Sequence, residues 1–158
     1  MTPSASGPGW RPASASACTA IAEIGAGAYL NGARLRTPEP PPESEMTGQL
    51  NTGFFEEEER NRLRAEARVR FGRIGSLSCA GHDFLAQSLG ERHFSFYRRL
   101  WPWDHVAGVL LLRESGGKVD RIDGVPYRAG DRVHGLLATS RAETWSALRG
   151  FLGNRGLR

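Results

Sequence analysis

Hydrophobic and polar positions along the chain alternate between helical and strand-like spacing. The clearest helical pattern lies in the middle of the chain, where apolar or small residues recur every three or four positions. They are Leu77, Ala80, Gly81, Phe84, Leu85, Ser88 and Leu89. This one-sided stripe predicts a helix over Ser76–Leu89, with Ser76 as its N-cap and Gly90 at its end.

Two further segments have helical character. Residues Asp104–Ser115 are apolar nearly all round until Arg113, a pattern that predicts a buried helix ended by a Gly-Gly pair. The segment Arg141–Phe151 is predicted to close the chain as a helix. Its inner side is expected to be formed by Trp145, Leu148 and Leu152.

A charged helix is predicted nearer the N-terminus. In Glu56–Arg70 the glutamates crowd the first turns and the arginines the last, an order that suits the helix dipole. Acid–base pairs four residues apart, such as Glu56 and Arg60, add to its stability. Few of its residues are apolar, so we expect a solvated surface helix without a ligand.

Short strands are predicted between these helices. Ala20–Glu23 begins a hairpin whose turn is marked by Asn31-Gly32, because both positions of a type I′ turn need positive φ. The return strand at Leu35–Arg36 runs into a proline-rich surface loop. Further strands are expected at 69–74, at 92–97, around Val119 and at 136–139. Strands that alternate with helices predict a mixed-sheet α/β fold in layers.

The two ends of the chain differ from this middle. Residues 1–18 are rich in Ser, Ala, Pro and Gly without any period, so we predict that they are disordered. The folded part is expected to be a single domain over residues 19–152, followed by a short tail at 153–158.

Composition argues against several classes of protein. The chain has 158 residues, and its longest apolar run, Val106–Leu112, is far too short for a membrane span. The N-terminus lacks the apolar segment of a signal peptide. Two cysteines, Cys18 and Cys79, give neither a disulfide framework nor a zinc-site spacing. We therefore expect a cytoplasmic protein without a membrane partner.

The net charge of +4 arises from twenty arginines and one lysine, Lys118, against seventeen acidic residues. Guanidinium groups suit phosphate, which keeps anionic ligands under consideration. The arginines are scattered rather than clustered with aromatic residues, so no nucleic-acid surface is expected.

Asp104 is the most informative candidate for chemistry. It follows Trp101 and Trp103 and precedes the apolar segment Val106–Leu112. A carboxylate in such surroundings must be capped, paired or bound to a metal, because an unpaired buried charge is too costly. One interpretation is an N-cap that accepts the backbone N–H groups of its own helix. The other is a metal ligand.

The residues around Asp104 resemble the signature of the inositol monophosphatase family. Trp103-Asp104-His105-Val106-Ala107-Gly108 and the later Glu114-Ser115-Gly116-Gly117 are similar to its Trp-Asp-x-Ala-Ala-Gly and Glu-Ala-Gly-Gly. Residues 25–32 resemble its Gly-x-Gly-Ala-x-x-Asn-Gly hairpin, and Arg73-Ile74-Gly75-Ser76 its Gly-Ser/Thr turn before a helix. The resemblance runs in order from Thr19 to Leu152 and implies the second half of a layered αβαβα fold.

The resemblance implies a magnesium-dependent hydrolase of small phosphomonoesters, such as inositol phosphate or a related sugar or amino-alcohol phosphate. Mg²⁺ prefers oxygen ligands, and paired ions can activate water and stabilise a leaving oxygen. By the resemblance, Asp104 is a metal ligand that also lies near the substrate hydroxyl. Gly75, Ser76 and Leu77 would offer backbone donors to the substrate at a helix N-terminus.

Two departures from the family pattern change this expectation. Tyr97, flanked by Arg98 and Arg99, occupies the substrate-binding position where many members carry a glutamate for sugar-like hydroxyls, which shifts the expected substrate away from inositol itself. The family's earlier glutamate and its Asp-Pro-x-Asp-Gly-Thr/Ser metal motif do not precede the hairpin. One carboxylate cannot assemble a two-metal site, so we expect a truncated domain with impaired hydrolysis. The alternatives are a non-catalytic remnant or interaction module, and a chain that pairs with a separate chain carrying the other half.

An incomplete layered fold would leave one sheet face uncovered. We therefore expect self-association through surfaces near Val106–Leu112 and Leu136–Ala138.

The remaining candidates for catalytic or metal-binding residues are weaker. The four histidines at 82, 93, 105 and 134 lack metal-ligand spacing, and Cys79 has no adjacent base that would make it a nucleophile.

Overall fold

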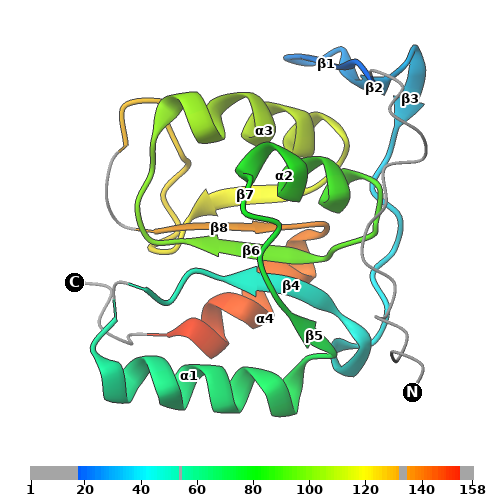
Figure 1. Ribbon diagram of the computed structural model, residues 1–158. Helices are drawn as coiled ribbons and strands as arrows, with labels where there is room; N and C mark the ends of the chain where they lie inside the picture. The colour runs from blue at the N-terminus through cyan, green and yellow to red at the C-terminus, as the bar shows by residue number, and fades with distance from the viewer. Residues whose placement is uncertain (1–17, 54, 132–134, 154–158) are drawn as a thin grey trace, which may run out of the picture.

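Two sheets organise the protein in the computed structural model, which describes residues 18–53, 55–131 and 135–153 (Figure 1). The smaller sheet is antiparallel and has the order β1-β2-β3. Its strands are β1 (Ala20–Glu23), β2 (Gly27–Leu30) and β3 (Ala33–Leu35). The predicted hairpin is thus confirmed, and Asn31 at its turn has a positive φ of 50°.

The larger sheet is mixed and has the order β5-β4-β6-β8-β7. Its strands are β4 (Thr47–Leu50), β5 (Arg73–Ile74), β6 (Phe94–Tyr97), β7 (Lys118–Arg121) and β8 (Leu136–Thr139). Strand β4 pairs in parallel with β5 and with β6, whereas β8 is antiparallel to both of its neighbours. The carboxyl ends of β4, β5 and β6 therefore meet at one edge of the sheet.

Helices cover both faces of the larger sheet (Figure 1). Helices α1 (Glu57–Arg70) and α4 (Ala142–Leu152) lie on one face, and α2 (Ala80–Ser88) and α3 (Pro102–Glu114) on the other. A 3₁₀ turn, η1 (Glu43–Glu45), lies in the proline-rich loop. One core cluster includes Leu63, Phe94, Phe96 and Trp145, and another includes Phe84, Val109, Leu112 and Leu136. Burial of these apolar surfaces is the main stabilising contribution.

Helix α3 lies between the two sheets. On its second side Leu111 packs with Ala28 and Leu35 of the smaller sheet. At its C-terminal end the Glu114 carboxylate accepts hydrogen bonds from the backbone N–H groups of Gly25 and Gly27, each at 3.0 Å. The layer order is helix, sheet, helix, sheet, which confirms the mixed α/β class and explains why α3 is apolar nearly all round.

The first turns of α3 are less buried than its apolar pattern predicts. The smaller sheet lies over the C-terminal end of the helix (Figure 1), and Trp103 and Val106 are 73% and 38% exposed. The prediction of complete burial is therefore wrong for this end of the helix.

The predicted start of α2 is also wrong. The helix begins at Ala80 rather than Ser76, and its N-cap position is Cys79. Ser76 uses its hydroxyl differently, because Oγ accepts a hydrogen bond from the backbone N–H of Ser78 at 2.9 Å. Ser78 itself has a φ of +60°, which breaks the helical path before Cys79.

The sheet face that we expected to find uncovered is covered. Leu136, Leu137 and Ala138 of β8 have no exposed surface, because helices lie on both sides of the strand. The proposed basis for self-association at this strand is wrong, although self-association itself stays a prediction. Exposed large apolar side chains lie elsewhere, at Ile21, Ile24, Val69, Leu89, Trp101, Trp103, Val106 and Val125.

The predictions for residues 1–17 and for the tail beyond Gly153 fall outside the described residues. Among the helices of the described parts, none combines the length and the apolar character needed to cross a membrane.

Candidate functional site

Two adjoining hollows lie where β4, β5 and β6 end and where α2 and α3 begin. This is the edge at which open α/β sheets usually bind ligands. The Asp104 hollow has a volume of about 620 Å³, and its lining includes Asp104, Arg99, Trp101, Trp103 and His105. The Asp83 hollow has a volume of about 470 Å³, and its lining includes Gln49, Thr52, Arg64, Ser76 and Asp83. Both are lined by Asn51, Ser78, Cys79, Ala80 and Tyr97.

Asp104 lies in the first turn of α3. The helix begins two residues earlier, at Pro102, because proline is well suited to the first helical position. Asp104 is exposed, so the expectation of a buried carboxylate is wrong, and so is its interpretation as the N-cap, a position that Trp101 occupies. A carboxylate in the first turn still interacts favourably with the helix dipole. Its role as a metal ligand stays a prediction.

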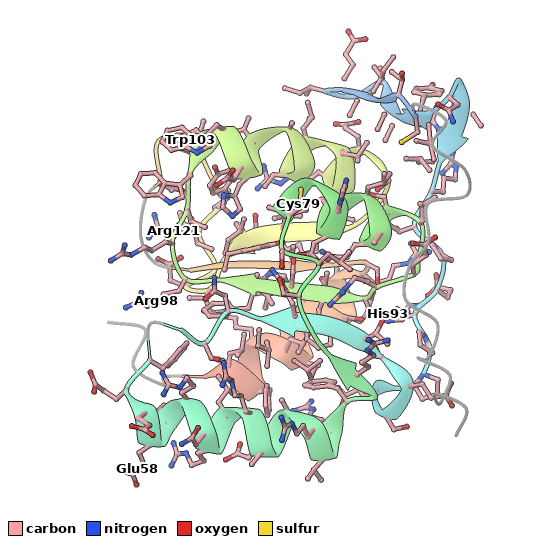
Figure 2. All side chains as sticks on the ribbon, viewed as in Figure 1. Glu58, Cys79, His93, Arg98, Trp103 and Arg121 are labelled. Carbon is pink, nitrogen blue, oxygen red and sulfur yellow. The ribbon has the colours of Figure 1, made fainter. Side chains whose placement is uncertain are left out.

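The helix N-terminus that faces the hollows is formed by Ser78, Cys79 and Ala80. Figure 2 shows Cys79 at the start of α2 and Trp103 at the start of α3. Of the residues expected to form this turn, Ser76 lines the Asp83 hollow. Gly75 instead extends the strand pairing, because its N–H donates to the carbonyl of Gly48 at 2.9 Å. Leu77 is half-buried and precedes the helix. Substrate binding by Gly75, Ser76 and Leu77 stays a prediction, but the expectation that they lie at the helix N-terminus is wrong.

Tyr97 ends β6 and lines both hollows. Its hydroxyl group donates to Oδ2 of the buried Asp83, and Nε of Arg92 lies 3.5 Å from Oδ1 of the same carboxylate. Burial raises the pKa of Asp83, an effect that Arg92 and Tyr97 oppose. Burial and the neighbouring Asp83 carboxylate raise the pKa of Tyr97, so its hydroxyl stays protonated and can act as a donor.

His105 holds the start of α3 in place. Its ring is buried, packs edge-on against Tyr97 with centroids 4.8 Å apart, and has Nδ1 within 3.1 Å of the Trp101 backbone nitrogen. Burial lowers the pKa of His105. His93 is also buried, where Nδ1 accepts the backbone N–H of Thr47. These two histidines have structural contacts, whereas His82 is exposed and His134 lies outside the described residues.

Comparison with known proteins identifies the family to which the chain belongs. The sequence model of the inositol monophosphatase family matches residues 11–150, most of the chain. The chain belongs to the inositol monophosphatase family. A fructose-1,6-bisphosphatase/inositol-1-monophosphatase of Thermotoga maritima is 34% identical over 111 residues, which cover 67% of this chain and 40% of that protein. An inositol-1-monophosphatase of Rhizobium meliloti is 35% identical over 125 residues, which cover 72% and 45% of the two chains.

Solved structures of the family have the same fold. The inositol monophosphatase of Anabaena superposes with a TM-score of 0.70 at 23% identity, over 85% of this chain and 54% of that chain. The present chain therefore spans about half the length of its structural relative, and less than half of the two curated relatives. This agrees with the prediction that the resemblance concerns one portion of the family fold.

A metal site of the family kind needs several oxygen ligands close together. Among the described residues, no group of three or more His, Cys, Asp or Glu side chains could hold a metal ion. Asp104 is the one carboxylate among the described residues that line its hollow. Asp120, farther along the chain, is instead paired with Arg113 at 3.1 Å and with Lys118. The described residues therefore do not by themselves fit a complete magnesium site.

The structure brings together Asp104 and Tyr97, both predicted as site residues of the inositol monophosphatase family, in one hollow. The sequence interpretation missed Asn51, Ser78 and Asp83. Asn51 follows a strand that was not predicted. Asp83 lies on the predicted helix, where a single carboxylate does not by itself indicate a functional site. The positive φ of Ser78 has no sequence signal, because serine rarely adopts that conformation.

Proposed function

We propose that this chain forms the substrate-binding side of a magnesium-dependent phosphomonoesterase site that takes a small phosphorylated substrate. One observation carries the proposal: the Asp104 carboxylate and the N-terminus of α2 line the same hollow at the carboxyl edge of the sheet. Backbone N–H groups at a helix N-terminus and the helix dipole attract phosphate. The family relationship supports hydrolysis as the reaction. The cytoplasm stays the proposed location.

The chemistry of the described residues limits what the chain does alone. A lone carboxylate binds a divalent cation weakly, and metal-assisted hydrolysis needs the ion held in a defined geometry. We therefore expect the chain to bind the phosphorylated ligand but to hydrolyse it poorly.

The test measures phosphate release and ligand binding on the purified chain with Mg²⁺ and a set of small phosphomonoesters, which includes inositol phosphate, a sugar phosphate and an amino-alcohol phosphate. We expect release close to the protein-free rate, and binding that is weakened in Asp104→Asn but retained in Glu143→Gln, which changes an exposed carboxylate of α4. Robust turnover that disappears in Asp104→Asn would overturn the expectation of impaired hydrolysis. Absence of binding in the unmodified chain would overturn the proposal itself.

The second candidate is a non-catalytic interaction module. It is favoured by the absence of a three-ligand group among the described residues. The same binding experiment separates the two candidates, because an interaction module has no reason to retain affinity for phosphomonoesters.

A further inference from the structure

The outer edge of β1 is open to a further strand. Among the described strands, β1 pairs with β2 alone. The carbonyl group of Thr19 accepts a hydrogen bond from the N–H group of Asn31, an arrangement in which residues 19, 21 and 23 direct their backbone groups toward β2. The intervening residues Ala20 and Ala22 therefore direct theirs outward, where no described strand meets them. A strand edge of this kind can accept an added strand.

The face of the smaller sheet that points away from α3 ends in an apolar side chain at this edge. Ile21 lies opposite Tyr29, and Tyr29 lies opposite Arg34, so their side chains form one row across the sheet. Ile21 ends the row and is 60% exposed. Glu23, the next residue of β1 on the same face, is exposed too. A strand beside β1 would gain an apolar contact at Ile21 and could place a basic side chain opposite Glu23.

A second uncovered surface lies on α3. Leu111 and Glu114 hold the smaller sheet on one face of this helix, near its end. Residues 103, 107 and 110 precede Glu114 at spacings of four, three and four, so they continue the same face. Trp103 is 73% exposed, Ala107 is exposed and Leu110 is half-buried. The apolar face thus extends toward the start of the helix, beyond the cover of the smaller sheet (Figure 1).

One extended segment would cover both surfaces. Helix α3 contacts β1 and β2, so the next strand position beyond β1 continues the interface between the smaller sheet and this helix. Successive side chains of a strand point to opposite faces of its sheet. In a strand added to β1, one set of side chains would therefore face the uncovered part of α3, and the other set would lie beside Ile21.

A second copy of this chain is a poor fit for that position. Antiparallel pairing of two β1 edges would form one continuous sheet with a two-fold axis perpendicular to it, so both copies of α3 would lie on the same side. Beyond α3 lies the larger sheet, which has five strands against three in the smaller sheet (Figure 1). Two larger sheets on the same side would compete for the same space. The position therefore suits a segment without such a body attached.

We propose that the edge of β1 and the apolar face of α3 bind an extended segment of a separate polypeptide, which adds to the smaller sheet as an antiparallel strand. The segment carries a basic residue opposite Glu23, an apolar residue opposite Ile21, and apolar residues at the intervening positions, which face α3. This inference goes beyond the proposed function and is independent of it, because strand addition does not require a ligand in either hollow.

The probe is the capped peptide acetyl-Gly-Lys-Val-Ile-Val-Thr-Lys-amide, which has this pattern when its isoleucine lies opposite Ile21. It is titrated into the full chain while amide hydrogen exchange is followed by NMR. In the free chain, the outward amides of Ala20 and Ala22 should exchange faster than that of Ile21, which points toward β2. When the peptide occupies about nine tenths of the chain, exchange at Ala20 and Ala22 should slow about tenfold, because each amide is open for about a tenth of the time.

Two matched peptides test the hydrogen bonds of the added strand. Methylation of both valine nitrogens removes the donors that face β1 and should abolish the slowing of exchange. Methylation of the isoleucine nitrogen, which points away from β1, leaves those donors in place and should retain the slowing at least in part.

Substitutions in the chain assign the binding to the two surfaces. Ala20→Pro removes an outward donor at the first residue of β1, a position that tolerates proline, and should weaken peptide binding by about threefold or more. Trp103→Ala truncates the largest exposed side chain of the α3 face and should weaken binding by about fivefold or more. Val69→Ala changes an exposed apolar residue of α1, on the other face of the larger sheet, and should leave binding unchanged (Figure 1).

No binding up to about 1 mM peptide, or equal binding of the three peptides, would overturn the inference. Slow exchange at Ala20 and Ala22 in the dilute free chain would also overturn it, because the chain itself would then cover the edge. Protection that rises with protein concentration alone would identify a second copy as the occupant and would contradict a separate polypeptide. Peptide binding that persists in a chain without affinity for phosphomonoesters would support the inference while contradicting the proposed function, so the two failures are distinguishable.

Discussion

The hydroxyl group of Tyr97 donates a hydrogen bond to Oδ2 of Asp83 across 3.3 Å. Asp83 is only 1% exposed, and its other carboxylate oxygen lacks a hydrogen-bond partner among the described residues, although Nε of Arg92 lies 3.5 Å away. The carboxylate thus lines a hollow, in surroundings that disfavour its charged form.

This arrangement makes stability depend on pH. Burial raises the pKa of Asp83 in the folded chain above its value in the unfolded chain. The folded state therefore holds the proton more tightly, so the stabilising contribution is complete below the unfolded pKa and is lost as pH rises through the folded pKa. In the unmodified chain, the free energy of unfolding should fall as pH rises from the unfolded to the folded pKa of Asp83. We expect this fall to be smaller in Asp83→Asn, as measured by urea denaturation at several pH values. Glu143→Gln, at an exposed position, serves as the control. Equal slopes in the unmodified chain and Asp83→Asn would contradict the prediction.

Glu114 is predicted to fasten the smaller sheet to α3. Replacement by Ala removes both acceptors for the N–H groups of Gly25 and Gly27, and should lower the free energy of unfolding by about 1–3 kcal/mol. Hydrogen exchange should accelerate in β1 and β2 while β8 stays protected, because the loss is local. Glu91→Ala, at an exposed position after α2, is the matched control. Exchange that is unchanged in β1 and β2 would show that apolar packing alone holds the hairpin.

Gly108 allows α2 and α3 to approach closely. A Cβ atom at this position would lie 2.2 Å from Cδ2 of Phe84, a side chain without exposed surface. Gly108→Ala should therefore destabilise the chain by about 1–3 kcal/mol, despite the higher helix propensity of alanine.

A second glycine in the same pair of helices supplies the control. At Gly81 the nearest atom to an added Cβ would be Sγ of Cys79, at 3.9 Å. Gly81→Ala should be neutral or stabilising by up to about 1 kcal/mol in thermal unfolding. Similar effects of the two substitutions would contradict the packing explanation.

The turn before α2 contains two serines with opposite predicted effects. Ser78 has a φ of +60°, so Ser78→Gly should relieve strain and raise the free energy of unfolding by up to about 1 kcal/mol. Ser76→Ala removes the acceptor for the Ser78 N–H and should lower it by about 0.5–1 kcal/mol. Chemical denaturation of both variants checks the signs, and a destabilised Ser78→Gly would show that its side chain has a larger role than its backbone.

The sequence analysis predicted correctly those elements in which the order of apolar and polar residues follows from the packing of one face. In α4, Trp145, Leu148 and Leu152 are buried as expected, because one face of the helix meets one face of a sheet. Helix α3 was predicted in nearly its observed extent, but an all-round apolar pattern cannot show that the second sheet covers one end and leaves Trp103 exposed.

Strand β4 was missed for a physical reason. Its sequence, Thr47–Leu50, contains Gly48 and Gln49 in place of an apolar alternation. Gly48 is needed there because an added Cβ would lie 2.5 Å from the carbonyl oxygen of Phe94 on the neighbouring strand. That requirement comes from a residue far along the chain, so local pattern could not predict the strand or the position of Asn51 after it. The exposure of Asp104 likewise depends on tertiary cover rather than on its apolar neighbours.

The hydrogen bond between Gly25 and Glu114 spans 89 positions of the chain, and this has a consequence during synthesis. At about 5–20 residues per second, a ribosome needs roughly 4–18 s to make that intervening stretch. During that interval the helix on which the hairpin packs has not yet been made. A short antiparallel hairpin is only marginally stable by itself. The hairpin, which is made before the helix, is thus docked late. Ile21 and Ile24, exposed even in the finished fold, are the side chains that a nascent-chain chaperone would meet.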